Sequence, residues 1–195
     1  MKTKINHILF IIFIMLGCSH KQTNEKNKIN YPYTLIHQIG NQIDYSLSHQ
    51  NENISELRMW IIPELTNPKT LVRIKEIDSV TYIQWIHFNY TKDIQQHYKL
   101  DSLKLQNRKT NLRIDSLISN LKDLGFDKAQ SPSDSIKGLI VDGITYVFEV
   151  RQDKYYKAID CNAPQLFADS NSKKLTEILK FLSKKMNFYY NEKGI

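Results

Sequence analysis

The stretch LVRIKEIDSVTYIQWIHFNY, residues 71–90, holds two apolar-rich segments separated by Asp78 and Ser79. In residues 71–77 apolar and polar side chains alternate, and residues 80–90 are rich in β-branched and aromatic side chains. Both patterns are typical of β-strands, and an Asp-Ser pair between them favours a turn. The stretch therefore predicts two consecutive strands that pair antiparallel.

Further strands are expected on both sides of this pair. Residues 57–62, LRMWII, end at Pro63, and Thr-Asn-Pro at 66–68 favours a turn. Residues 98–106 have an ambiguous pattern that we interpret as a fourth strand, and from Tyr31 the chain has the pattern of a half-buried strand. Together these segments predict an antiparallel meander.

Two helices are predicted from apolar side chains at helical spacing. Gly125 stands where a glycine ends the first helix, and Ser172 is the expected N-cap of the second. The two apolar stripes consist of Ile114, Leu117, Ile118, Leu121 and Leu124, and of Leu175, Ile178, Leu179, Leu182 and Met186.

A hairpin is expected between these helices. Residues 144–151 alternate, Gln152-Asp153-Lys154 turns the chain, and residues 155–161 return. The predicted fold class is therefore α+β: an antiparallel sheet, made of a meander plus a C-terminal hairpin, with two helices packed on one side. Residues 31–190 are expected to form one domain.

The N-terminus predicts a secretory signal. Lys2 and Lys4 precede nine apolar residues, 8–16, and Gly17 precedes Cys18. This run is shorter than the ~20 apolar residues of a membrane span. The sequence MLGC, residues 15–18, resembles the lipobox of bacterial lipoproteins. The resemblance implies removal of residues 1–17 and acylation of Cys18; an ordinary signal peptide is the alternative.

The segment after the lipobox is polar. Residues 18–30 are expected to be a lipidated tether between the membrane and the domain. His20 follows Ser19 where lipoproteins retained in the inner membrane would show Asp. The resemblance therefore implies an outer-membrane anchor with the domain facing the periplasm, where nucleic acid is not an expected partner.

Neither the net charge nor the cysteine content predicts a specific chemical function. The formal net charge of +7 could favour an anionic partner, but the lysines are scattered, which favours a solubilising role. Lipidation of Cys18 would leave Cys161 as the second cysteine. Cys161 is expected to be a buried core residue rather than a reactive thiol.

Known catalytic patterns are missing from the sequence. It contains no phosphate-binding glycine loop, no G-x-S-x-G and no histidine spacing of a metal site. No catalytic residue, cofactor or metal is predicted. An enzyme with a site dispersed along the chain is a less favoured alternative.

The hairpin is the candidate binding surface. Glu149 is expected to lie off the apolar face, and Tyr155 and Tyr156 follow Lys154. Tyrosine beside a cation recurs in recognition. Glu149 could instead pair with a cross-strand Lys or Arg as a structural contact.

A wider pattern resembles a small domain of uncharacterised bacterial envelope proteins, over about residues 55–185. It comprises Arg58-x-Trp60-Ile61, Val72-Arg73-Ile74, Asp142-Gly143, Tyr146, Glu149, Tyr155 and Pro164. The resemblance supports the fold and implies no activity. The expected function is a non-enzymatic binding or accessory module of the envelope with a protein partner. The alternative is an immunity lipoprotein that neutralises an antibacterial toxin in the periplasm.

Overall fold

The computed structural model describes residues 33–46, 55–66, 68–77, 79–95, 97–132, 143–152, 155–188 and 190. All of them belong to one compact unit, Tyr31–Ile195. The expected signal peptide, Cys18 and its tether, Asp142 and Lys154 lie outside the described residues.

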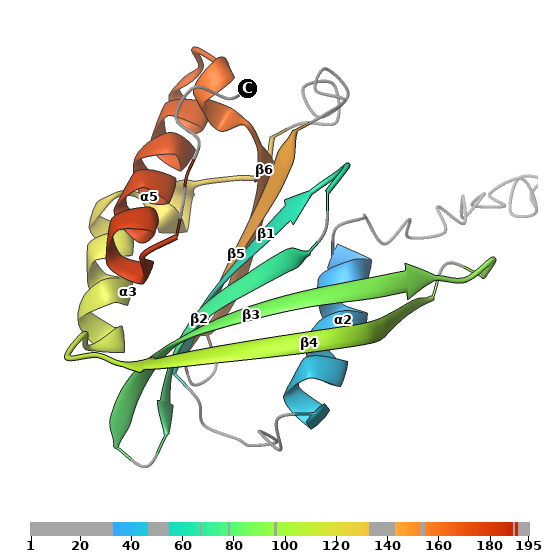
Figure 1. Ribbon diagram of the computed structural model, residues 1–195. Coiled ribbons are helices and arrows are strands. Elements are labelled where there is room, and N and C mark those ends of the chain that lie inside the picture. Colours follow the sequence, from blue (N-terminus) through green and yellow to red (C-terminus); the bar gives the residue numbers. More distant parts are fainter. Residues whose placement is uncertain are drawn as a thin grey trace, which may run out of the picture. The chain divides into compact units, whose positions relative to one another are not determined.

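The described residues form a six-stranded antiparallel sheet in the order β4-β3-β2-β1-β5-β6. The meander of the first four strands joins the hairpin of the last two through the pairing of β1 with β5 (Figure 1). The predicted α+β class, the meander, the fourth strand and the hairpin are thus confirmed. The strands are β1 Glu56–Pro63, β2 Lys69–Ile77, β3 Val80–Lys92, β4 Tyr98–Lys109, β5 Ile144–Gln152 and β6 Tyr155–Asn162.

Helices cover both faces of this sheet. Helices α3, Ile114–Asp123, and α5, Ser170–Met186, lie on one face, and α2, Tyr33–Ser46, lies on the other (Figure 1). The expectation of two helices on one side was therefore incomplete, and the strand expected from Tyr31 was wrong.

Helix α2 was missed because its sequence gives mixed signals. Gly40 in its interior is unfavourable for a helix. The glycine has a packing reason: a Cβ added there would lie 3.4 Å from the Trp60 ring, so α2 lies close to β1. The buried side chains of the helix nevertheless recur at helical spacing: Leu35, Ile36, Ile39 and Ile43.

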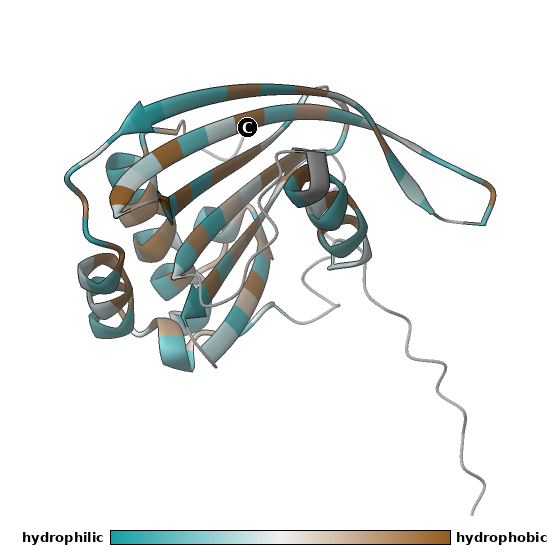
Figure 2. Cartoon of the chain, turned by 90° about the horizontal axis from the view of Figure 1, so that it is seen from below, coloured by the Kyte–Doolittle hydropathy of each residue, from teal (hydrophilic) through white to brown (hydrophobic). Residues whose placement is uncertain are grey.

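Each face of the sheet has its own apolar cluster, because side chains alternate along every strand. Figure 2 shows this alternation as hydrophobic and hydrophilic bands along the strands. Under α3 and α5 the cluster includes Met59, Phe148 and Cys161. Under α2 it includes Trp60, Leu71 and Phe88. Cys161 is 1% exposed, which confirms it as a core residue.

The helix ends are defined by local chemistry. Gly125 follows α3 with φ of 83°, as expected of a C-terminal glycine, and leads into a short 3₁₀ helix, η1, Phe126–Lys128. The N-cap of α5 is Asp169 and not Ser172, because the Asp169 carboxylate accepts a 2.9 Å hydrogen bond from the Ser172 amide. No helix in the described part of the chain is long and apolar enough to cross a membrane.

Candidate functional site

A row of polar side chains crosses the α2 face of the sheet. Arg58 on β1 lies opposite Arg73 on β2 and opposite Glu149 on β5. Gln84 on β3 lies opposite Arg73, and Asn107 on β4 lies opposite Gln84. These five residues, called the polar row below, are cross-strand neighbours over five of the six strands.

Four of the five members of the polar row are buried although they are charged or polar, and only Asn107, on the edge strand β4, is exposed. Arg73 is 0% exposed, Glu149 4% and Arg58 5%. Each of the three lies two residues from a member of the apolar cluster under α2: Leu71, Val147 and Trp60. The two-residue period therefore places them on the face that α2 covers. Buried charges need partners, since an unpaired one is strongly unfavourable.

Two carboxylates hold the two arginines. Asp44 on α2 accepts hydrogen bonds from Nη2 of Arg58, at 2.8 Å, and from Nη1 of Arg73, at 2.7 Å. Glu56 lies 2.9 Å from Arg58 Nη2 and 3.5 Å from Arg73 Nη1. Burial would raise the pKa of the Asp44 carboxyl, but the two guanidinium groups outweigh it and hold that pKa below its ordinary value.

Glu149 has different partners. Nε1 of Trp60 donates to one carboxylate oxygen at 2.5 Å, and the hydroxyl of Tyr156 donates to the other at 2.9 Å. Burial and the neighbouring Glu149 carboxylate both raise the pKa of Tyr156, so the hydroxyl stays protonated and can donate. A buried glutamate thus connects a buried tryptophan to a tyrosine that is 55% exposed.

The row next to the polar row leads to the surface. Glu56 lies opposite Lys75 on one side and opposite Arg151 on the other, and Arg151 lies opposite Tyr156. The Arg151 guanidinium is 5.6 Å from the centre of the Tyr156 ring, a cation–π distance. Tyr156 and Arg151 are the exposed end of this arrangement, and we call them the Tyr156 patch.

The structure separates the residues expected to form one surface. Glu149 and Tyr156 lie on the α2 face and bond to each other. Tyr155 lies on the opposite face, where its hydroxyl donates to Asp127 at 2.7 Å and its ring is 5.2 Å from the Lys122 ammonium. Tyr155 therefore fixes η1 against β6. Lys154 lies outside the described residues.

Polar contacts also fix α2 at its N-terminus and along its length. The Tyr33 hydroxyl donates to Asp160 on β6 at 2.9 Å, and burial raises its pKa to about 12. Gln38 and Gln42 bond to the backbone of β4 at Tyr98 and Leu100. The helix is thus attached to both edge strands, β4 and β6, and also to the two arginines on the central strands β1 and β2.

Sequence reasoning missed the buried polar row to which Glu149 belongs. Strand alternation alone makes Arg58 and Arg73 ordinary outward positions, although each stands between large apolar residues two positions away. Placing the strands in register would have aligned both arginines with Glu149. Asp44 could not be recognised as the partner of the two arginines, because helix α2 was not predicted.

The arrangement can hold Tyr156 in one orientation at the surface. Among the described residues, no group of three or more His, Cys, Asp or Glu could hold a metal ion. The fold and this patch define an α+β protein with helices on both faces of a six-stranded sheet and a polar row beneath one of them. Comparisons with protein-family models, with curated proteins and with solved structures find no match.

Proposed function

We propose that the protein is a lipid-anchored binding module of the bacterial cell envelope. Acylated Cys18 holds it to the outer membrane, and its domain binds a protein partner in the periplasm through the Tyr156 patch. The anchor rests on the signal sequence and lipobox of residues 1–18. The binding role rests on the geometry around Tyr156.

The observation that carries the binding role is the support beneath Tyr156. The side chain is more than half exposed, yet its hydroxyl bonds to a glutamate that is 4% exposed and that Trp60 also holds. Fixing an exposed side chain before binding lowers the conformational entropy that association would otherwise remove. Tyrosine and arginine are also the residue types that carry much of the energy of protein interfaces.

The chemistry of the patch indicates the kind of partner. Arg151 is exposed beside the tyrosine and presents a positive charge next to an aromatic ring. A partner with an acidic patch beside an apolar contact would match both features, since complementary charge favours encounter.

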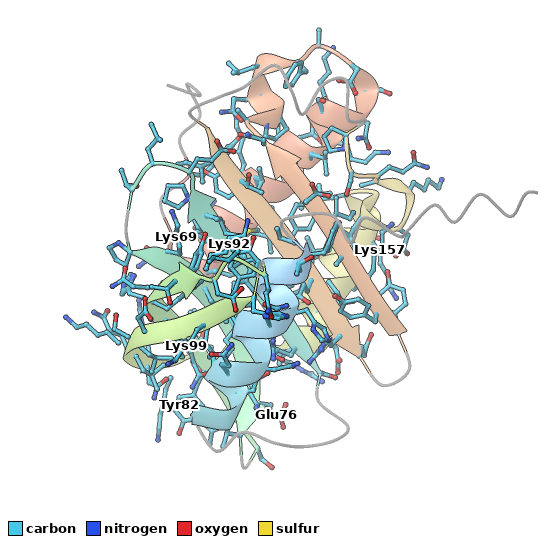
Figure 3. All side chains as sticks on the ribbon, turned by 90° about the vertical axis from the view of Figure 1, so that its right-hand side faces the viewer. Lys69, Glu76, Tyr82, Lys92, Lys99 and Lys157 are labelled. Carbon is cyan, nitrogen blue, oxygen red and sulfur yellow. The ribbon has the colours of Figure 1, made fainter. Side chains whose placement is uncertain are left out.

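The test is capture of partners from envelope extract by the full-length protein, in wild-type and variant forms. We expect wild type to retain a specific protein and Tyr156→Ala to lose it. Tyr82→Ala is the matched control, because Tyr82 is a partly exposed tyrosine on β3, across α2 from β6 in Figure 3. Equal capture by all three forms would contradict the proposal. Identification of a captured toxin would make the protein an immunity lipoprotein.

A further inference from the structure

A polar recess lies at the N-terminus of α5. Its volume is about 370 Å³, and it is lined by the end of η1, the residues that follow it, and the N-cap and N-terminal end of α5, including Lys128, Asp169, Ser172 and Lys174. None of its lining residues belongs to the polar row or to the Tyr156 patch, so a ligand in the recess would be independent of the proposed function.

The charges around the recess favour an anion. The 17-residue helix α5 directs its N-terminal dipole into it. Lys128 and Lys174 add two ammonium groups, and neither has an ion pair or hydrogen bond within the described residues. Asp169 is the opposing charge: its hydrogen bond with Ser172 lowers the pKa of its carboxyl, so it is ionised at neutral pH. One positive charge remains in excess.

One residue in the lining of the recess has a buried hydroxyl without a hydrogen-bond partner among the described residues. Ser172 is 1% exposed, and among the described residues its Oγ has no hydrogen-bond partner. The backbone of Ser172 is fully used, since its amide bonds to Asp169 and its carbonyl accepts from Thr176. Buried hydroxyl groups in native proteins nearly always have a partner, so this one needs an explanation. An oxyanion in the recess would accept its hydrogen bond.

The walls of the recess are preformed. Asn171 and Gln130 exchange two hydrogen bonds, of 3.1 and 2.8 Å, which join the first turn of α5 to the segment after η1. The aliphatic part of Lys174 lies across Gly125, where a Cβ would be only 3.1 Å from its Cε. The glycine that ends α3 therefore also makes room for the lysine that borders the recess.

We propose that this recess binds an oxyanion of phosphate size. Lys128 and Lys174 supply the charge, the Ser172 hydroxyl donates a hydrogen bond, and the end of α5 contributes its dipole. The ligand chemistry is a phosphoryl group, carried either by free phosphate or by a lipid headgroup.

The test is a titration of the ¹⁵N-labelled full-length protein with inorganic phosphate at constant ionic strength, followed by NMR. We expect saturable shifts of the amide signals of Gln130 and of residues 170–172. Lys174→Met should weaken binding at least about tenfold, and Ser172→Ala several-fold. Lys184→Met is the control, because Lys184 is an exposed lysine at the other end of α5.

Two results would overturn the proposal: no saturable shift, or the same dissociation constant in wild type and Lys174→Met. An otherwise unchanged spectrum of each variant shows that it is folded. A parallel titration with short-chain phosphatidylglycerol distinguishes the sources. Tighter binding of that diester would identify a lipid headgroup as the ligand, and tighter binding of inorganic phosphate would identify the free anion.

Discussion

Arg58 and Arg73 lie side by side on adjacent strands, both are almost completely buried, and both bond to the single carboxylate of Asp44. Two guanidinium groups in direct cross-strand register repel each other. Their burial is tolerated because Asp44 from α2 and Glu56 from β1 neutralise both charges. Helix α2 is therefore held to the sheet by ion pairs of Asp44 as well as by apolar packing.

Removing the Asp44 charge should destabilise the domain. Asp44→Asn leaves Glu56 as the one carboxylate, among the described residues, in salt-bridge contact with the two buried guanidinium groups, and breaking such a pair typically costs about 3 kcal/mol. Urea denaturation measures the loss. Asp123→Asn is the control, since Asp123 is exposed at the end of α3 and should change stability by less than about 0.5 kcal/mol. Equal losses in the two variants would show that the arginines do not depend on Asp44.

Asp44 should also make stability depend on pH in the acid range. Its folded pKa lies below the ordinary value of 3.8, so ionised Asp44 stabilises the fold above that value. This contribution is lost as pH falls through the folded pKa. We expect the urea midpoint of wild type to fall more steeply than that of Asp44→Asn between about pH 5 and pH 2. Parallel curves for the two proteins would contradict the assignment.

Glu149 and Tyr156 should differ in their effects on stability. Glu149→Ala removes the acceptor of the buried Trp60 donor, which should cost about 2 kcal/mol and lower Tm by roughly 5 °C. Tyr156→Ala removes an exposed side chain and should lower Tm by about 2 °C or less. Calorimetry compares the two. A larger loss in Tyr156→Ala would make the tyrosine a structural residue rather than a binding residue.

Both the backbone conformation and the packing at position 125 favour a glycine. Its φ of 83° is unfavourable for a residue with a Cβ, and such a Cβ would contact Lys174. Gly125→Ala should destabilise the protein by about 1–2 kcal/mol in urea denaturation. Gly125→Asn should lose less, because asparagine tolerates the left-handed conformation. A larger loss of stability in Gly125→Asn than in Gly125→Ala would mean that contact with Lys174 outweighs the backbone strain.

Acylation of Cys18 is testable in cells. Labelled palmitate should be incorporated into wild type and not into Cys18→Ala, because the lipobox resemblance places the acylation site at that thiol. Cys161→Ala controls for the other cysteine and should be labelled like wild type. Equal labelling of wild type and Cys18→Ala would end the lipoprotein proposal. Protease added to intact cells should leave the domain uncut if it faces the periplasm.

Most of the sheet could be predicted from the sequence, because its strands alternate and are bounded by turn residues. Both predicted helices followed from apolar side chains at helical spacing, whereas the fourth strand had an ambiguous pattern that the structure decides. Helix α2 was missed although its buried side chains recur at helical spacing, since Gly40 and the β-branched isoleucines weaken a helical pattern. The N-cap of α5 was misplaced because Asp169 and Ser172 are both good caps, and only the geometry decides between them.

The candidate site was only partly predictable for a simple geometric reason. Adjacent residues of a strand point to opposite faces, so Tyr155 and Tyr156 could not form one surface. The register of the hairpin, with Gln152 opposite Tyr155, puts Tyr156 on the face of Glu149. The burial of Glu149 depends on α2 and Trp60, which the sequence does not place together.

Photo-crosslinking in living cells tests the proposed binding role most directly. The photoreactive amino acid p-benzoylphenylalanine replaces Tyr156 in the full-length protein, and Tyr82 in a control of the same chemistry. After irradiation we expect one discrete higher-mass adduct from position 156 and none from position 82, since only the Tyr156 patch contacts the partner. No adduct at position 156, or the same adduct at both positions, would contradict the proposal that this patch binds a protein in the envelope.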